Sequence, residues 1–291
     1  MTLTDLLRMI RVKQWVKNTF VFFPLLFSGQ LFDIPSQINM VFTFFAFCLT
    51  ASSVYILNDL LDYARDRHHP NKAQRITIKG HLNKPFLIFM ILFLLAAGLF
   101  LSLRINGLVL GVISLYVFLN VIYNLYTKRV VILDVIFIAT GFYLRILAGA
   151  YAINVLPSVW LQMCVFILAL FLGFTKRRHE MTMLREKAHE HRAVLEHYTA
   201  YLLDQLIMIC STLAIVFYGL YTISPDMVAR MGNYDMVYSL VFVIYGIFRY
   251  LYLVHVKKLG DDPGEVLFSD FPLFIAIVLW TIFVGVIVYI H

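Results

Sequence analysis

Long apolar stretches, separated by short connections rich in Lys and Arg, constrain this chain more than any other feature of its sequence. Hydrophobic residues make up 61% of its 291 residues, and charged residues make up only 14%. A soluble domain is far less apolar than this. Because about 20 apolar residues suffice to cross a bilayer as a helix, we expect an all-α polytopic membrane protein. The sequence predicts a bundle of nine transmembrane helices, at 17–32, 38–57, 85–103, 107–124, 132–153, 157–175, 203–223, 236–255 and 270–290.

The distribution of basic residues predicts the orientation of these spans. Of the 24 Lys and Arg residues, only Arg104 and Arg230 fall in connections on one side of the membrane, and Arg145 and Arg249 lie inside spans. The others precede the first span or lie in connections on the opposite side. By the positive-inside rule, that side and the N-terminus are cytoplasmic, and nine crossings place the C-terminus on the other side. The net charge of +7 is then mainly a topology signal, and nucleic acid is not implied as a partner.

The chain is predicted to form a single domain over residues 1–291, with three segments outside the membrane core. Residues 1–16 mix apolar and basic side chains, which indicates an amphipathic interfacial helix. Two cytoplasmic loops, 58–84 and 176–202, are much longer than the other connections. Long loops in compact proteins are usually functional, so we expect these two to form a cap over the site.

A carboxylate-rich sequence, NDLLDYARD, begins where the second span ends. At 100° per residue on a helix, Asn58, Asp59, Asp62 and Asp66 fall within one arc of about 100°. Carboxylates at the mouth of a span are costly unless something binds them. Their hard oxygen atoms suit Mg²⁺, which is usually held by one or two carboxylates together with substrate phosphates. The alternative is a solvated helix end or a structural salt-bridge cluster.

Basic residues in both long loops indicate an anionic ligand. In the first loop, Lys72 and Arg75 follow the acidic residues and can hold the free oxygens of a metal-bound diphosphate. The second loop opens with a mainly cationic cluster that comprises Lys176, Arg177, Arg178 and Glu180. A positive-inside flank alone also explains basic residues at a helix end, so a purely topological role stays open.

Two charged residues fall within the fifth predicted span. Asp134 and Arg145 are eleven residues apart, which is three helical turns, so they can share one helix face. Ionisable residues inside a span are functional candidates by default. The alternative is that each pairs with a neighbouring helix as a structural contact. Near the chain start, Arg11, Lys17 and Asn18 are candidates for a phosphate site.

The sequence NDLLDYARD resembles the NDxxDxxxD motif of the UbiA superfamily of intramembrane prenyltransferases. The nine predicted spans, the charged loops after spans two and six, and Tyr123 followed by Lys128 after span four also match, so the resemblance covers essentially the whole chain. Within the superfamily the chain is most similar to the decaprenyl-phosphate phosphoribosyltransferase branch. The stretches that carry this similarity are RVKQWVKN, NDLLDYARDRHHPNKAQR, YNLYTKRVVILDV, GFYLRILAGA and TKRRHE. Typical members carry a second acidic DxxxD motif after span six, where this chain has KRRHE.

The resemblance implies a reaction and a location. It implies Mg²⁺-dependent transfer of 5-phosphoribosyl from 5-phosphoribosyl diphosphate to a polyprenyl phosphate, with release of diphosphate, in a bacterial inner membrane. Asp59, Asp62 and Asp66 would be the catalytic and metal-holding residues, with Asn58 as a further ligand. The acceptor phosphate is already an anion, so no strong general base is required.

The basic residues are divided among three phosphate groups under this resemblance. The diphosphate is assigned to Lys72 and Arg75. The 5-phosphate is assigned to Lys176, Arg177 and Arg178. The lipid phosphate is assigned to Lys17, Lys128 and Arg145. The predicted substrate-binding set is completed by Asn18, Tyr123, Asp134 and Glu180.

Two other functions remain open from the sequence. A conventional UbiA-type prenyltransferase would move the isoprenoid itself from its diphosphate to an aromatic or haem acceptor, and it would use the same first motif. A transporter or lipid-binding protein would line a path with Asp134, Arg145 and Arg249. The clustering of acids at one cytoplasmic edge, rather than near the midplane, disfavours the transporter.

Overall fold

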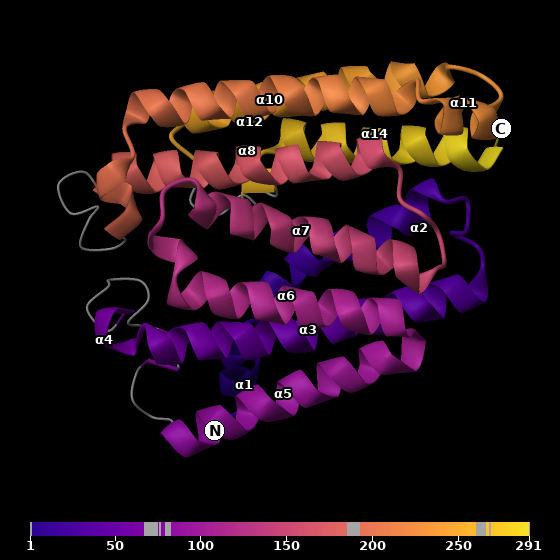
Figure 1. Cartoon of the computed structure of the whole chain (residues 1–291). Helices are drawn as coiled ribbons and strands as arrows, with labels where there is room; N and C mark the ends of the chain where they lie inside the picture. The colour runs from indigo at the N-terminus through magenta and orange to yellow at the C-terminus, as the bar shows by residue number, and fades with distance from the viewer. Residues whose placement is uncertain are drawn as a thin grey trace. The chain divides into compact units, whose positions relative to one another are not determined.

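The computed structural model describes residues 2–66, 75, 77–78, 83–184, 193–259, 266–267 and 269–290 (Figure 1). Contacts divide the chain into two compact units. Unit 1 comprises Met1–Val130 and Leu144–Leu156, and unit 2 comprises Val131–Tyr143 and Pro157–His291. Each unit is helical throughout its regular structure in the part of the chain that is described, which confirms the all-α prediction.

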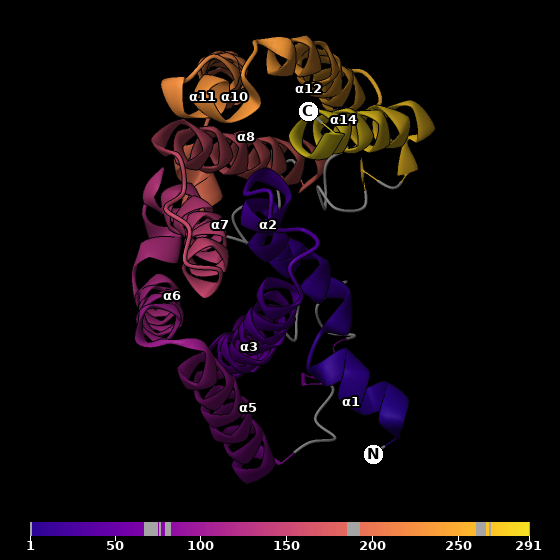
Figure 2. The same ribbon diagram turned by 90° about the vertical axis from the view of Figure 1, so that its right-hand side faces the viewer.

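Unit 1 is built around one long helix, α3. Its helices are α1 (Leu3–Met9), the 3-10 helix η1 (Val12–Phe22), α2 (Phe23–Phe27), α3 (Ile34–Leu61), α4 (Tyr63–Asp66), α5 (Lys84–Ile105), α6 (Gly107–Leu125) and the 3-10 helix η3 (Thr127–Arg129). The helix α3 packs against α5, α6 and η1, as the end-on view shows (Figure 2). Asp33 caps its N-terminus by accepting a hydrogen bond from the Ser36 amide at 2.9 Å, and the helix continues to the acidic motif.

The first predicted span differs most from expectation. Residues 17–32 do not form one long α-helix, because η1 and α2 take their place and the chain turns at Gly29, where φ is +76°. The predicted amphipathic helix over 1–16 is also shorter, because α1 ends at Met9 and Arg11 adopts a left-handed conformation with φ of 54°. Met9 nevertheless packs into an apolar cluster with Ile56.

The segment η1 runs antiparallel to α3. The Trp15 indole donates a hydrogen bond to Ser52 at 3.1 Å, and the Asn18 amide donates to the Cys48 sulfur at 3.2 Å. A 3-10 helix rises about 2.0 Å per residue and an α-helix about 1.5 Å. The 11 residues of η1 and the 5 residues of α2 thus extend over roughly 30 Å, about the thickness of the hydrocarbon core.

Unit 2 contains most of the remaining helices. They are α7 (Leu133–Ala152), the last part of which belongs to unit 1, α8 (Val159–Leu184), the 3-10 helix η5 (Ala193–His197), α10 (Ala200–Thr222), α11 (Pro225–Met231), the 3-10 helix η6 (Asp235–Ser239), α12 (Leu240–His255) and α14 (Phe271–Ile290). The helices α8 and α10 lie side by side over much of their length (Figure 1). Phe171, Leu203, Ile207 and Leu253 are central to the buried core of this unit.

Eight of the described helices are long and apolar enough to cross a membrane. They correspond closely to eight of the nine predicted spans, and the chain is an integral membrane protein. The predicted boundary of the second loop is wrong at its start, because α8 continues to Leu184 rather than ending near residue 175. Lys176, Arg177, Arg178 and Glu180 therefore lie on a helix, not in a loop.

Candidate active site

The acidic end of α3 is a compact cluster of ion pairs centred on Asp59. This carboxylate is buried, with 2% of its surface exposed. It accepts hydrogen bonds from Arg11, from Arg75 Nη1 at 2.8 Å and from the Thr77 hydroxyl at 2.7 Å. A buried carboxylate without such partners would be strongly destabilising. The charge of Asp59 is thus matched by two guanidinium groups from separate parts of unit 1.

A second ion pair lies one turn further along the chain. Lys128 Nζ donates to both carboxylate oxygens of Asp62, each at 2.7 Å. Lys128 is supplied by η3, directly after α6, and is 9% exposed. The structure therefore brings Arg75 and Lys128 to the acidic motif, although the sequence analysis assigned Lys128 to the lipid phosphate. Tyr123 lies on α6 and is partly buried.

The acidic end of α3 offers the donor atoms that a magnesium ion requires. The last turn of this helix and the residue after it carry two carboxylates, Asp59 and Asp62, and the side-chain amide of Asn58, all of which offer oxygen atoms. Within the described residues, no three His, Cys, Asp or Glu side chains already form a metal cage. Mg²⁺ is commonly held by only one or two carboxylates plus substrate phosphates and water, so this donor set still fits the ion. The Asp66 side chain and all of Lys72 lie outside the described residues.

Arg145 lies elsewhere in unit 1. It is 4% exposed, donates to Asn18 Oδ1 at 2.7 Å and to the Tyr116 hydroxyl at 3.2 Å, and stacks against the Phe47 ring at 5.4 Å. Phe47 precedes Asp59 by twelve residues on α3, which corresponds to ~18 Å along the helix. The structure thus joins Arg145 to Asn18 but does not bring either residue to the acidic cluster. Lys17, next to Asn18, is half-buried.

The basic end of α8 is organised by a buried ion pair. Arg177 is 1% exposed, and its Nε donates to Asp134 Oδ2 at 2.6 Å. Arg177 also donates to Glu180 at 3.0 Å, and Tyr198 donates to the other oxygen of Asp134 at 2.9 Å. Asp134 and Arg145, which can share a face of α7, therefore have different partners. Lys176, next to Arg177, is half-buried.

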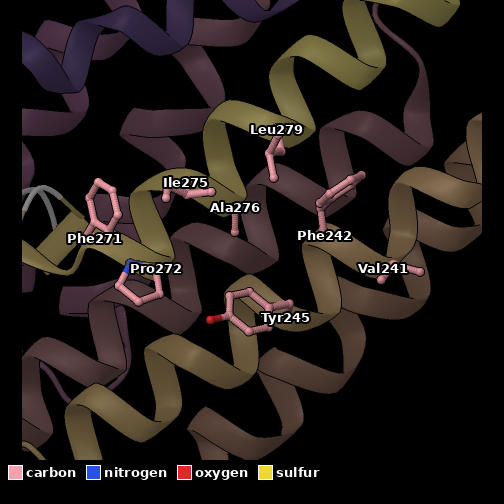
Figure 3. A pocket seen from close by; sticks show the side chains of 8 residues that line it. All are labelled: Val241, Phe242, Tyr245, Phe271, Pro272, Ile275, Ala276 and Leu279. Carbon is pink, nitrogen blue, oxygen red and sulfur yellow. The ribbon is translucent and has the colours of Figure 1, made fainter.

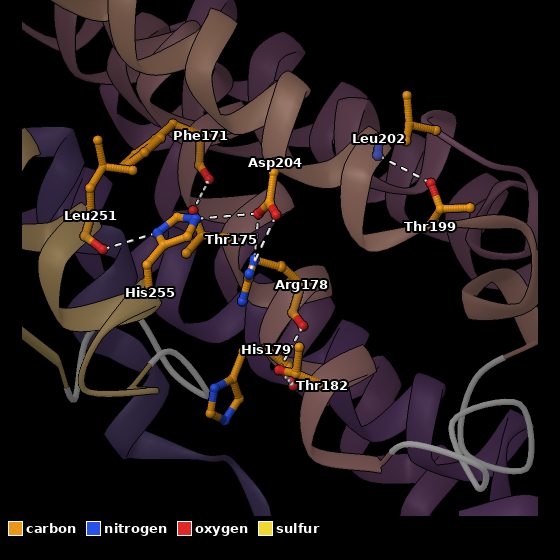
Figure 4. A network of polar contacts seen from close by, with 10 residues as sticks. All are labelled: Phe171, Thr175, Arg178, His179, Thr182, Thr199, Leu202, Asp204, Leu251 and His255. Atoms are coloured by element: carbon orange, nitrogen blue, oxygen red, sulfur yellow. Dashed lines mark hydrogen bonds and ion pairs between the residues drawn. The ribbon is translucent and has the colours of Figure 1, made fainter.

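Arg178 takes part in a separate network that Figure 4 shows. It forms an ion pair with Asp204 of α10, with a second contact between Nη2 and Oδ2 at 3.3 Å. His255, at the end of α12, contacts the same carboxylate at 3.2 Å (Figure 4). All three side chains are partly exposed, so this network is accessible to a solute. It joins the ends of α8, α10 and α12.

Two contacts to carboxylates of the candidate site could not have been predicted from the sequence. Thr77 and Tyr198 each bind a key carboxylate, but neither belongs to a charged motif. Their partners, Asp59 and Asp134, lie 18 and 64 residues away in the chain. A contact of this range leaves no periodic signal in the residues around it.

An apolar groove in unit 2 has none of these charged residues in its lining. It has a volume of about 420 Å³ and lies between α12 and α14. Side chains of both helices line it, among them Val241 and Phe242 of α12 and Phe271 and Leu279 of α14 (Figure 3). Tyr245 carries the side-chain oxygen drawn there, and Ala276 lies among the larger apolar side chains (Figure 3). The predicted site residues do not line this groove, so we do not assign the transfer reaction to it.

Comparison with known proteins identifies the family. The UbiA prenyltransferase family matches residues 19–266. The chain belongs to the UbiA prenyltransferase family. The matched region includes the acidic end of α3, the basic end of α8 and parts of both units. The chain is accordingly an enzyme, a transferase that is embedded in the membrane.

Two curated relatives of the UbiA family are similar over nearly the whole chain. Decaprenyl-phosphate phosphoribosyltransferase of Mycolicibacterium smegmatis is 26% identical over 98% of this chain and 93% of that protein. The protein of the same name from Corynebacterium glutamicum is 29% identical over 98% of this chain and 87% of that protein. These similarities confirm the predicted resemblance within the UbiA family.

A solved structure supports the fold. A UbiA homologue from Archaeoglobus fulgidus bound to GPP and Mg²⁺ has a TM-score of 0.74 and 16% sequence identity, and the match covers 98% of this chain and 99% of that chain. At this level of identity the likeness concerns the fold alone. The helices of the present chain therefore have the UbiA arrangement.

Proposed function

We propose that this UbiA enzyme transfers 5-phosphoribosyl from 5-phosphoribosyl diphosphate to a polyprenyl phosphate. The bond between ribose C1 and the diphosphate breaks, a bond from a lipid phosphate oxygen to C1 forms, and diphosphate leaves. The observation that carries the proposal is the end-to-end similarity to two proteins named decaprenyl-phosphate phosphoribosyltransferase. The basic sequence KRRHE at the end of α8, where typical members carry acids, supports a substrate with an additional phosphate.

The acidic end of α3 is the proposed magnesium site. Asn58, Asp59 and Asp62 would hold Mg²⁺, and Asp66 is retained as a further candidate from the sequence. When bound, the ion neutralises the diphosphate leaving group and stabilises the charge that develops on it. The partial occupation of such a site by protein ligands leaves room for substrate phosphate oxygens.

The cations that pair with these acids are the proposed diphosphate ligands. Arg11, Arg75 and Lys128 neutralise Asp59 and Asp62 in the described structure, so Lys128 is moved from the lipid phosphate to this group. A diphosphate offers each of them the same kind of charged oxygen acceptor as a carboxylate. We infer that binding exchanges these partners, so that the carboxylates turn to the metal and the cations to the phosphates. Lys72 joins this group from the sequence alone.

Lys176 and Arg178 are the proposed ligands of the 5-phosphate. Both lie on α8 and are partly exposed, and Arg178 already contacts the exposed carboxylate of Asp204. Arg177 is instead buried between Asp134 and Glu180, so we give it an indirect role. Lys17 remains the proposed ligand of the lipid phosphate, and Arg145 is reassigned to the packing of η1 because its described partners are Asn18 and aromatic rings.

A transfer assay tests this function directly. Protein in lipid vesicles is given Mg²⁺, radiolabelled 5-phosphoribosyl diphosphate and a polyprenyl phosphate, and the lipid phase is counted. We expect label in the lipid, and we expect chelation of Mg²⁺ by EDTA to abolish the transfer until Mg²⁺ is restored. Transfer that continues undiminished in EDTA would sink the metal proposal while leaving the transfer proposal intact.

A conventional prenyl transfer is the second candidate. The structural neighbour bound to GPP and Mg²⁺ favours it, since that protein has the same fold. In the same assay, it predicts label in the product only when the isoprenoid diphosphate carries the label. The basic end of α8 favours the phosphoribosyl donor over this candidate.

We also propose that the enzyme lies in a bacterial inner membrane with its N-terminus in the cytoplasm. The basic connections support this orientation through the positive-inside rule. The acidic end of α3 and the basic end of α8 would then both face the cytoplasm.

A further inference from the structure

The chain makes an unusual turn at Ile132, directly before α7. Its φ is +69°, in the region that β-branched residues rarely adopt. The Leu133 amide donates a hydrogen bond to the Val131 carbonyl at 2.8 Å, which closes a three-residue turn around Ile132. Such γ-turns with positive φ are rare and strained. Ile132 is 39% exposed, so apolar packing of its side chain does not account for the conformation.

The hydroxyl of Tyr198 holds this turn. The Ile132 amide donates to the Tyr198 oxygen at 2.7 Å, and the same hydroxyl donates to Asp134 Oδ1 at 2.9 Å. Burial, followed by the nearby charge of Asp134, raises the pKa of Tyr198, so the hydroxyl keeps the proton that it donates. One side chain thus binds both the strained residue and the carboxylate two positions later.

Asp134 carries the connection onward to the basic end of α8. Its second oxygen accepts the 2.6 Å hydrogen bond from Arg177 Nε, and both residues are almost fully buried. A charge-assisted hydrogen bond in such surroundings is directional and strong. Because Arg177 lies between Lys176 and Arg178 on one rigid helix, fixing Arg177 also fixes the backbone that carries those two cations.

Tyr198 itself is anchored by the chain that precedes it. It follows η5, where Val194 and Leu195 are buried in the core of unit 2. Only 4% of Tyr198 is exposed. Packing therefore holds the ring in place without help from the hydroxyl. The hydroxyl in turn holds its two partners, the Ile132 amide and Asp134, in fixed positions.

We propose that Tyr198 is a positioning residue, whose hydroxyl locks the turn at Ile132 and, through Asp134 and Arg177, sets the position of the basic end of α8. Its role in catalysis rests on the proposed binding of a donor phosphate by Lys176 and Arg178. Its role in the turn rests on geometry alone, so the two parts can be tested apart.

A double-mutant cycle tests the lock without any substrate. Tyr198→Phe keeps the buried ring and removes only the hydroxyl, whereas Ile132→Gly removes the barrier to positive φ. We expect Tyr198→Phe to lower the unfolding temperature by a few degrees, and by clearly less in the Ile132→Gly background. An equal loss in both backgrounds would show that the hydroxyl does not hold the turn.

The same cycle covers the case in which Tyr198→Phe alone does not fold. Recovery of the folded protein in the Ile132→Gly, Tyr198→Phe double variant then supports the lock. Failure of both variants to fold, with Ile132→Gly alone folded, would count against relief of the turn as the explanation.

Kinetics test the positioning role. Tyr198→Phe should raise the KM for the phosphate-bearing donor about tenfold, with kcat changed less than about twofold because the acidic end of α3 is untouched. Tyr201→Phe is the matched control, since Tyr201 is 73% exposed and should leave both constants unchanged. An unchanged KM in folded Tyr198→Phe protein overturns the positioning role. Lack of phosphoribosyl transfer by the unmutated protein counts against the proposed function, and the unfolding cycle still tests the lock.

Discussion

Asp59 is both a structural ion-pair partner and a proposed metal ligand. Its carboxylate is buried at a helix end, where Arg11, Arg75 and Thr77 satisfy it. Removing one partner from a buried ion pair typically costs about 3–5 kcal/mol, because the other charge is left uncompensated. Loss of activity in Asp59→Ala would therefore have two causes, loss of the fold and loss of metal binding, which this substitution does not separate.

Asp62 gives the cleaner test at the residue scale. Its side chain is 20% exposed and pairs with Lys128, so Asp62→Asn should leave the protein folded. We expect transfer to fall at least about 100-fold, because a ligand of the proposed metal is lost. Asp226→Asn changes an exposed carboxylate of α11 and should retain activity. Full activity of folded Asp62→Asn protein would argue against the metal site.

The sequence predicted these acids better than their partners. The spacing of Asn58, Asp59 and Asp62 follows helical periodicity, which residues close in the chain reveal directly. Arg75 was expected near the acids because it follows them in the same loop, whereas Lys128 was assigned to the lipid phosphate and instead pairs with Asp62. Thr77 and Tyr198 could not be predicted, because their roles depend on tertiary contacts between distant parts of the chain.

At the scale of elements, η1 and α7 approach each other at Gly149. A Cβ atom at this position would lie 2.1 Å from the backbone oxygen of Val21. Backbone cannot yield as a flexible side chain does, so Gly149→Ala should destabilise the protein by about 1–3 kcal/mol. The measurement is thermal unfolding of the Gly149→Ala variant and of the unmutated protein in detergent.

Gly111 of α6 supplies the control for that prediction. A Cβ atom there meets nothing within 4 Å. Gly111→Ala should therefore be neutral or slightly stabilising, because Ala favours a helix over Gly by up to about 1 kcal/mol. Equal effects of the two substitutions would mean that the close approach of η1 and α7 is not tight.

A polar link between α12 and α14 has a predictable pH dependence. Hydrogen bonds from Arg249, at 3.0 and 2.8 Å, hold the pKa of Asp270 below its ordinary value of 3.8. A lowered pKa in the folded state contributes stability that is fully present above that ordinary value and is lost as pH falls through the lower one. We expect the unfolding temperature to decline below about pH 4, with a weaker decline for Arg249→Gln. Identical pH profiles would contradict the link.

Elements were predicted well where their apolar pattern is long and uninterrupted. Eight helices begin and end within a few residues of the predicted spans. The exception is the end of α8, which continues through polar residues to Leu184. The first span was not an α-helix, because Pro24, Gly29 and the polar residues Lys17 and Asn18 interrupt it. Neighbouring helices, rather than its own periodicity, determine how this segment folds.

At the scale of the whole molecule, the number of membrane crossings determines on which side each terminus lies. Because η1 and α2 extend over roughly 30 Å, they can cross as a ninth segment. We therefore predict that the two termini lie on opposite sides. Cysteines introduced near each end can be probed with an impermeant thiol reagent, since Cys48, Cys164 and Cys210 are buried. Labelling of both ends from one side would mean eight crossings.

The chemistry of the product tests the central claim most directly. The enzyme is given 5-phosphoribosyl diphosphate labelled with carbon-14 in its ribose and a polyprenyl phosphate labelled with phosphorus-32, together with Mg²⁺. The account predicts one lipid product that carries both labels in equal amounts, formed by the unmutated enzyme and lost in Asp62→Asn. A lipid without the ribose label, with transfer seen only from an isoprenoid diphosphate, would contradict it.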